Sequence, residues 1–266
     1  MKSAPVFFLT LVAATVLAEA PDTVFLDELT WTEVRDKLES GTNTVIVATA
    51  GTEQNGPHMV LGKHKFIIRA TAEQIARRLG NTLVSPIITH VPEGGIDPPT
   101  GHMRYPGTIT LPNVYFMKVV EYTARSLEVH GFTNIVFIGD SGGNQRGMKE
   151  VADALNEEWR GGPTRVLFVA DYYSNNGVTE WLESQGETEE SIGRHAGIAG
   201  TSAVLAVAPE HVRLGERKPG GGFQGSGVSG DPSKASVEYG KKGIELKVET
   251  AVREIGRLIA EAETSR

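Results

Sequence analysis

The sequence predicts an α/β fold, a three-layer α/β/α sandwich with a mostly parallel central sheet. Short apolar runs rich in β-branched residues alternate along the chain with longer segments of helical periodicity. Strands that alternate with helices are joined by crossover connections, which give parallel pairing and helices on both faces of the sheet. The length of 266 residues is sufficient for one such domain with a sizeable core.

The first half of the chain contains two predicted strands and three predicted helices. The run 44–49, Thr-Val-Ile-Val-Ala-Thr, is apolar and β-branched, which is typical of a buried strand. Trp31, Val34 and Leu38 recur at helical spacing before it. We expect, in order, a helix over 26–39, a strand over 44–49, a helix over 66–79, a strand over 83–89 and a helix over 113–130.

The second half continues this alternation and ends with a long amphipathic helix. The runs 134–139 and 164–170 are again apolar and rich in β-branched residues. Residues 215–232 are rich in glycine and lack periodicity, so no element is predicted there. The expected order is strand 134–139, helix 145–159, strand 164–170, helix 180–185, helix 201–208 and helix 237–263.

The N-terminal residues have the pattern of a secretory signal peptide. Lys2 precedes an apolar run over 6–17, and small residues follow at 18–20. The run is short for a transmembrane helix, and no later segment reads as a membrane span. We expect a signal peptide over 1–20, one domain over 21–266 and a periplasmic or secreted protein. An uncleaved anchor or a buried first helix is the alternative.

Charge and cysteine content narrow the classes of function. The formal net charge is −7, so the chain lacks the basic excess that nucleic-acid binding requires. The chain has no cysteine, which excludes disulfides, thiolate metal ligands and a cysteine nucleophile. We expect a small-molecule substrate, no nucleic-acid partner and no membrane contact after signal cleavage.

Polar clusters follow the carboxyl ends of the first three predicted strands, where proteins of this class bind ligands. The first cluster lies in the loop after 44–49 and contains Glu53, His58 and His64. A carboxylate and two imidazoles can supply oxygen and nitrogen ligands to a divalent metal. The alternative is a solvated loop of ordinary polar residues.

Later clusters add further candidates. His102 follows the second strand and can bind substrate or simply hold its loop together. Asp140 follows the third strand and can ligate a metal or cap the next helix. Ser141 lies in Gly-Asp-Ser-Gly-Gly at 139–143, which matches the short pattern of a nucleophile elbow. His195 stands among small residues at the entrance of a predicted helix, where it can reach the site or cap the helix.

The order and spacing of these clusters resemble the creatininase family. The resemblance covers about residues 27 to 260 and implies an α/β/α fold. Five segments match the family in order. Residues 53–58 correspond to its Glu-Gln-His-Gly-Pro-His, 105–108 to Phe-Pro-Gly-Thr and 139–144 to Asn-Gly-His-Gly-Gly-Asn. Residues 195–202 correspond to His-Ala-Gly-x-x-Glu-Thr-Ser, and 230–232 to Gly-Asp-Pro.

This resemblance implies hydrolysis of C–N bonds in cyclic or linear amides at a two-metal site, with zinc or manganese, in a homo-oligomer such as a hexamer. The metals of such a site activate a bridging water molecule. Glu53 keeps one metal-ligand position of the family. His195 keeps the histidine of the family's His-Ala-Gly motif. Five other positions are changed, and they hold Asn55, His64, Ser141, Gly143 and Gly200.

Three hypotheses follow for the function. The first is an exported metal-dependent hydrolase of small cyclic or linear amides, or of lactones, with Glu53, His64 and Asp140 as metal ligands. The second is a catalytically inactive relative that binds a small ligand, and the third is a metal-free serine hydrolase. The candidate catalytic residues are His195, His58 and Ser141, and the candidate substrate-binding residues are Asn55, His102 and Asn144.

Overall fold

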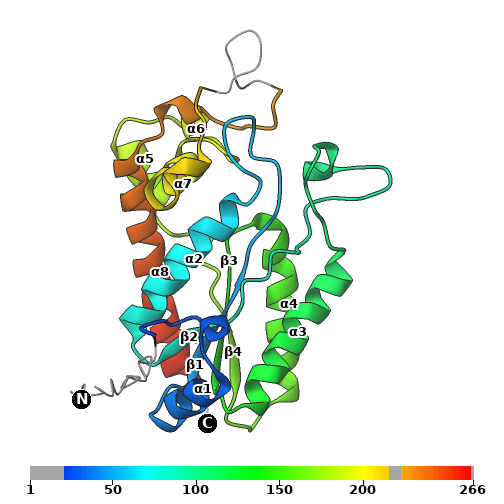
Figure 1. Cartoon of the computed structure of the whole chain (residues 1–266), viewed down its shortest axis with the longest axis vertical. Coiled ribbons are helices and arrows are strands. Elements are labelled where there is room, and N and C mark those ends of the chain that lie inside the picture. Colours follow the sequence, from blue (N-terminus) through cyan, green and yellow to red (C-terminus); the bar gives the residue numbers. More distant parts are fainter. Residues whose placement is uncertain (1–20, 216–222, 224, 265–266) are drawn as a thin grey trace, which may run out of the picture.

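The centre of the protein is a four-stranded parallel sheet with the strand order β2-β1-β3-β4 (Figure 1). The computed structural model describes residues 21–215, 223 and 225–264, so the predicted signal peptide over 1–20 lies outside it. Helices cover both faces of the sheet, which confirms the predicted three-layer α/β/α sandwich. The strands are β1 (Thr44–Thr49), β2 (Thr82–Val84), β3 (Asn134–Gly139) and β4 (Arg165–Phe168).

The two faces of the sheet belong to two separate hydrophobic cores, because side chains alternate along each strand. In β1, Ile46 and Ala48 face one core, whereas Val45 and Val47 face the other. β1 and β3 have the predicted bounds, and every residue in both strands is buried. A strand covered on both faces needs apolar residues at nearly every position, which explains their continuous apolar runs.

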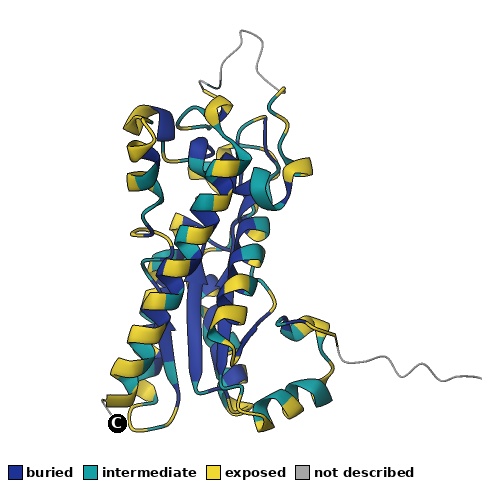
Figure 2. Ribbon diagram, turned by 90° about the vertical axis from the view of Figure 1, so that its left-hand side faces the viewer, coloured by how far each residue is buried: buried dark blue, intermediate teal, exposed yellow. Residues whose placement is uncertain are grey.

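Two long helices pack on each face of the sheet. α2 (Lys63–Leu79) and α8 (Val237–Thr264) cover the face of Ile46, and α3 (Asn113–Val129) and α4 (Gly142–Glu158) cover the other (Figure 1). Figure 2 shows buried strands between helices whose outer surfaces are exposed. No helix in the described part of the chain combines the length and apolar character of a membrane span.

Short helices lie beyond the carboxyl ends of the strands (Figure 1). They are α5 (Val178–Ser184), α6 (Glu189–Ile192) and α7 (Ile198–Val207). α7 packs against both α2 and α8, so the segment that precedes it is held over the end of the sheet. This segment carries His195.

Three helices begin at positions that periodicity alone does not predict. α1 (Trp31–Glu39) begins after a capping box, in which Thr30 accepts from the Glu33 N–H and the Glu33 carboxylate accepts from the Thr30 N–H. The residues before it form a 3₁₀ helix. α2 and α4 each begin three residues earlier than expected, at Lys63 and Gly142. The early start of α2 places the Lys63 side chain on a helical turn at the end of the sheet.

The second strand is shorter than the predicted run of 83–89. β2 ends at Val84, and pairing resumes only as one bridge between Thr49 and Ile88. Pro86 interrupts the run because it has no N–H group to donate to a neighbouring strand. The chain then forms the long loop that carries His102 into the region beyond β1.

Replacing Ile46 with alanine should destabilise the protein by about 2–5 kcal/mol, because the lost side chain leaves a cavity in the core. Ile46 is fully buried in a central strand. Urea-induced unfolding followed by circular dichroism measures the change. Ile96→Ala is the matched control, since Ile96 is 60% exposed and its truncation should change stability by less than about 0.5 kcal/mol. Equal losses in both variants would contradict the position of β1 in the core.

Candidate active site

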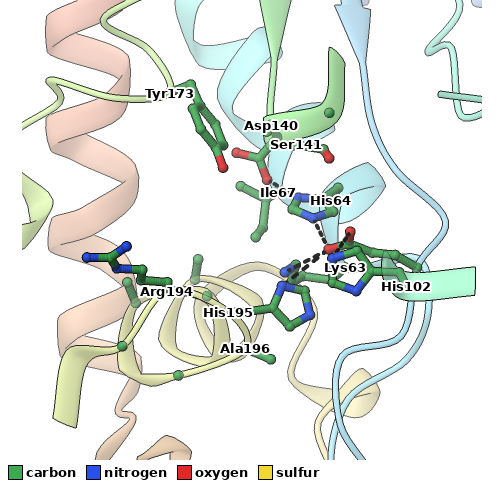
Figure 3. A pocket seen from close by; sticks show the side chains of 18 of the residues that line it. Lys63, His64, Ile67, His102, Asp140, Ser141, Tyr173, Arg194, His195 and Ala196 are labelled. Atoms are coloured by element: carbon green, nitrogen blue, oxygen red, sulfur yellow. Dashed lines mark hydrogen bonds and ion pairs between the residues drawn. The ribbon is translucent and has the colours of Figure 1, made fainter. Parts of the chain in front are cut away.

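A cavity of about 820 Å³ lies at the carboxyl ends of β1 and β3, a size suited to a small molecule. Its walls come from the loops after β1 and β2, the turn between β3 and α4, the segment before α7, and the helices α2 and α8. Figure 3 shows the side chains that converge in it. Those at its centre are Glu53, Lys63, His64, His102, Asp140 and His195.

Glu53 is at the centre of these contacts, because four nitrogen-bearing side chains surround its buried carboxylate. His64 Nε2 lies 2.6 Å and Lys63 Nζ 3.4 Å from Oε1. His102 Nε2 lies 3.3 Å from Oε2, and His195 Nδ1 lies 3.7 Å from Oε1. Burial alone would raise the pKa of Glu53, but the hydrogen bond and charge of His64 and the charge of Lys63 hold that pKa well below its usual range. Glu53 is therefore an anion at neutral pH.

His64 links Glu53 to Asp140 at the end of β3. Figure 3 shows the His64 ring beside the Asp140 carboxylate. Its Nδ1 lies 2.8 Å from Asp140 Oδ2, while its Nε2 contacts Glu53. The second oxygen of Asp140, Oδ1, accepts from Lys247 Nζ and from the Tyr172 hydroxyl at 3.3 Å. Burial would raise the pKa of Asp140, but the charges and hydrogen bonds of Lys247 and His64 keep it well below its usual range. Both nitrogens of His64 and both oxygens of Asp140 are thus engaged within the protein.

Glu93, from the loop after β2, is the neutral carboxyl group of the cavity. Burial, together with the hydrogen bond and charge of Glu53, raises the pKa of Glu93 to about 9. Ser141 Oγ donates to Glu93 Oε1 at 3.2 Å. Gly51 permits the close approach, because a Cβ atom there would lie 1.9 Å from Glu93 Oε1. At neutral pH, the contacting carboxyl groups of Glu53 and Glu93 therefore hold one proton between them.

The hydrogen bond of His195 determines which of its ring nitrogens carries hydrogen. Nε2 lies 2.8 Å from the carbonyl oxygen of Gln54, so Nε2 is the donor. Burial lowers the pKa of His195 to about 4, so the ring is neutral at pH 7. Nδ1 then keeps a lone pair, which faces Glu53 Oε1 at 3.7 Å. A lone pair and a carboxylate that face each other are suited to a cation between them.

Gln54 also fixes the tautomer of His102, which is the same as that of His195. Gln54 Oε1 accepts from the Gly56 N–H at 3.0 Å, and Nε2 donates to the Gly227 carbonyl at 2.9 Å. The same amide nitrogen lies 3.1 Å from His102 Nδ1, which must then accept. His102 Nε2 carries the hydrogen and points toward Glu53 Oε2. His102 can offer Nε2 to a metal only when this hydrogen moves to Nδ1, and the Gln54 amide must then rotate.

One group in the described part of the chain has the geometry of a metal site, and its members are Glu53, His102 and His195. Each offers one ligand atom, and these atoms lie within 4.8 Å of one another. The predicted ligands Glu53, His64 and Asp140 also lie together, but as a hydrogen-bonded chain with His64 in the middle. Glu53 alone belongs to both sets, because His64 and Asp140 present no free ligand atom in this arrangement.

Ser141 lines the cavity but lacks the base that a serine nucleophile needs. Its hydroxyl donates to Glu93, and no histidine within the described ranges accepts a hydrogen bond from it. The histidines on the cavity wall, His64, His102 and His195, contact Glu53 instead. The arrangement therefore gives no support to a metal-free serine hydrolase.

Three predicted site residues are fully buried and do not line the cavity. One polar atom of each is hydrogen-bonded within the protein. The contacts are His58 Nε2 with Thr201 Oγ1 at 3.0 Å, Asn55 Nδ2 with the Glu53 carbonyl at 2.9 Å, and Asn144 Nδ2 with Thr49 Oγ1 at 2.7 Å.

Sequence reasoning did not select three charged residues of the cavity, Lys63, Glu93 and Lys247. Lys63 lies in the first polar cluster and Glu93 follows the second predicted strand, but both residue types are common in solvated loops. Lys247 lies 107 residues from Asp140, on an amphipathic helix whose lysines are expected in solvent. The position of Lys63 directly before His64 was the signal that could have drawn attention to it.

Sequence comparison places the chain among hydrolases of C–N bonds. The family model Creatininase, described as creatinine amidohydrolase, matches residues 27–255. Creatinine amidohydrolase of Pseudomonas putida is 27% identical over 196 residues, which cover 72% of this chain and 74% of that protein. The mycofactocin precursor peptide peptidase of Mycobacterium tuberculosis is 26% identical over 248 residues, which cover 83% and 88%.

Solved creatininase structures have the same fold. A crystal structure of creatinine amidohydrolase has a TM-score of 0.76 and 24% identity, over 89% of this chain and 98% of that chain. A creatininase mutant of zinc–zinc type has a TM-score of 0.74 and 23% identity, over 88% and 98%. A manganese creatininase has a TM-score of 0.72 and 25% identity, over 90% and 98%. The fold is therefore that of metal-dependent hydrolases.

Replacing Lys247 with methionine should destabilise the protein by about 3 kcal/mol, because the buried Asp140 carboxylate loses its ammonium partner. Urea-induced unfolding at neutral pH measures the loss. Lys242→Met is the matched control on the same helix, since Lys242 pairs with Glu245 at 2.8 Å on the surface. We expect little change in that variant. Comparable losses in both variants would show that the Lys247–Asp140 pair contributes nothing beyond a surface pair.

His58 should make the wild-type protein less stable in acid. Burial lowers the pKa of His58 to about 4, below its ordinary value of 6.5, so the unfolded chain binds the proton more readily. The free energy of unfolding should therefore fall by about 2 kcal/mol from this group between pH 7.5 and 5. His58→Gln lacks the group, so the stability difference between wild type and variant should shrink by that amount. Parallel pH profiles from chemical unfolding would contradict a buried, neutral His58.

Proposed function

Because the chain belongs to the creatininase family, we propose that it is a hydrolase of C–N bonds in small cyclic or linear amides, or of lactones, that uses one divalent ion, zinc or manganese. Membership of this amidohydrolase family rests on the match over residues 27–255. The observation that carries the proposal is the convergence of Glu53, His102 and His195 in one cavity.

The donor set of this triad fits a divalent ion of the zinc or manganese type. A carboxylate oxygen and imidazole nitrogens are ligands that both metals accept. The His195 lone pair already faces Glu53, and its Nε2–H is held by the Gln54 carbonyl, as in many metal-binding histidines. His102 completes the set after its hydrogen moves to Nδ1. Three protein ligands leave a position for substrate or water, which is the arrangement of catalytic metal sites.

The ion, when bound, supplies Lewis acidity toward an amide carbonyl and a water molecule. The protein's own groups position the substrate and handle protons. Glu93 holds a proton within the cavity, beside Glu53, where it can be given to the nitrogen of the broken C–N bond. Ser141 donates to Glu93 Oε1 and so fixes the orientation of this carboxyl group.

The cavity supports a small substrate with polar and apolar parts. Its volume of about 820 Å³ accommodates a small molecule or a short peptide end. Ile67 and Ala203 add apolar surface to a wall that otherwise carries the charged groups. The similar proteins are named for hydrolysis of creatinine and of a precursor peptide, and both reactions break amide-type C–N bonds. This common chemistry supports the amide class without selecting one member of it.

Two further parts of the proposal concern where and how the protein works. The composition of residues 1–20 supports export to the periplasm or outside the cell. Assembly as a homo-oligomer, such as a hexamer, follows from the family resemblance. Fractionation of cells that express the full chain tests the first point, and light scattering of the purified protein tests the second.

The second candidate function is a catalytically inactive protein that binds a small ligand. One observation favours it: Lys63 and Lys247 already neutralise Glu53 and Asp140 without any metal. Such a protein would bind amides or lactones in the cavity and release them unchanged. Calorimetric binding together with absent turnover would identify it.

Protein purified without chelator should contain about one zinc or manganese ion per chain, and chelation should abolish hydrolysis of small amides and lactones. His195→Ala should weaken metal binding at least about tenfold, because a direct ligand is lost. Plasma mass spectrometry measures metal content, and a colorimetric assay of released amine measures turnover.

His90→Ala is the control for this prediction, because His90 is exposed. We expect it to keep both metal and activity. Wild-type protein that hydrolyses amides with no bound metal would contradict the metal requirement. Protein that binds neither metal nor amides would contradict both candidate functions.

A further inference from the structure

The cavity holds two ammonium groups next to its two ionised carboxylates. Lys63 Nζ lies 3.4 Å from Glu53 Oε1, and Lys247 Nζ contacts Asp140 Oδ1. Lys63 is only 4% exposed, and lysine is seldom buried to this degree without a partner. The partner here is Glu53, the residue at the centre of the proposed metal triad.

The geometry points to Lys63 as the second cation of this site: its ammonium group takes the place beside Glu53 that a second divalent ion would need, and it limits the cavity to one ion. This inference rests on the proposed function, since it assigns a role to Lys63 within the same site. The same ammonium faces the cavity, so it also presents positive charge to the carbonyl oxygen of a bound amide.

The predicted ligands His64 and Asp140 offer no free ligand atom to a second divalent ion. Both nitrogens of His64 are hydrogen-bonded, to Glu53 and to Asp140. Both oxygens of Asp140 are likewise occupied, by His64 on one side and by Lys247 and Tyr172 on the other. An added ion would have to displace a buried ammonium or break this chain, and each change would leave a buried charge without a partner.

The position of Lys63 on the fold is unfavourable for a lysine that serves stability alone. Lys63 is the first residue of α2, where the helix dipole favours negative rather than positive charge. Its stem lies beside the first turn of α7, where a Cβ atom at Gly200 would make an ordinary van der Waals contact of 3.7 Å with Lys63 Cδ. A buried cation at the positive end of a helix is best explained by the anion that it faces.

Equilibrium dialysis against Zn²⁺ and Mn²⁺ tests the inference, with bound metal measured by plasma mass spectrometry. Wild-type protein should saturate at one ion per chain. Lys63→Met should either bind a second ion or bind the first at least about tenfold more tightly, because a positive charge next to Glu53 is gone. Lys65→Met is the matched control, since Lys65 is exposed two residues further along the same helix. It should behave as wild type.

The same experiment separates this inference from the proposed function. Two ions bound to wild-type protein would overturn the inference and leave the hydrolase proposal standing. Unchanged metal stoichiometry and affinity in Lys63→Met would also overturn it. No ion in the wild type but one in Lys63→Met would support Lys63 as the excluding cation and contradict the metal-dependent hydrolase. Lys63→Gln provides a second neutral variant if Lys63→Met fails to fold, as judged by circular dichroism.

Discussion

The buried carboxylate of Glu53 is the constraint on which the site depends. An ionised carboxylate removed from water is costly unless cations and hydrogen-bond donors surround it. Here the compensation comes from an ammonium group and three imidazoles, contributed by the start of α2, the loop after β2 and the segment before α7. Each of these segments is held in place partly by the attraction between its basic side chain and the Glu53 carboxylate. The arrangement of the cavity walls therefore depends on these charge interactions as well as on the packing of helices and strands.

The sheet topology explains why these charges meet. β1 lies between β2 and β3, and all three strands run in the same direction. Their following loops carry Glu53, Glu93 and Asp140 to one edge, where three carboxyl groups lie within a single cavity. Carboxyl groups so close together cannot all ionise, and the fold resolves this in two ways. Glu93 keeps its proton, whereas Asp140 is paired with Lys247 from α8 on the far side of the cavity.

The apolar runs of β1 and β3 made the sheet predictable, because a strand that is covered on both faces must be apolar throughout. The position of polar clusters after these strands also predicts that Glu53 and Asp140 lie at one edge of the sheet. Sequence reasoning does not predict the hydrogen-bond partners of individual atoms. Spacing shows that His64 is near both carboxylates but not that each of its nitrogens is already hydrogen-bonded. Lys247 lies 107 residues from Asp140, and no local pattern connects them. Which nitrogen and oxygen atoms remain free to bind a ligand depends on side-chain packing, which the sequence alone does not specify.

Metal ions and ammonium groups are two ways to neutralise the negative charge of buried carboxylates. A divalent ion carries two charges and demands several lone pairs in a fixed geometry, whereas a lysine carries one charge on a covalent stem and demands only an anion. In this cavity Asp140 has been matched to Lys247 and His64, so it no longer acts as an open ligand. His195 still directs the lone pair of Nδ1 at Glu53. The Lys63 ammonium group pairs with Glu53 but leaves this lone pair unused. The unused lone pair is the observation that favours the proposed single divalent ion over a closed network of ion pairs.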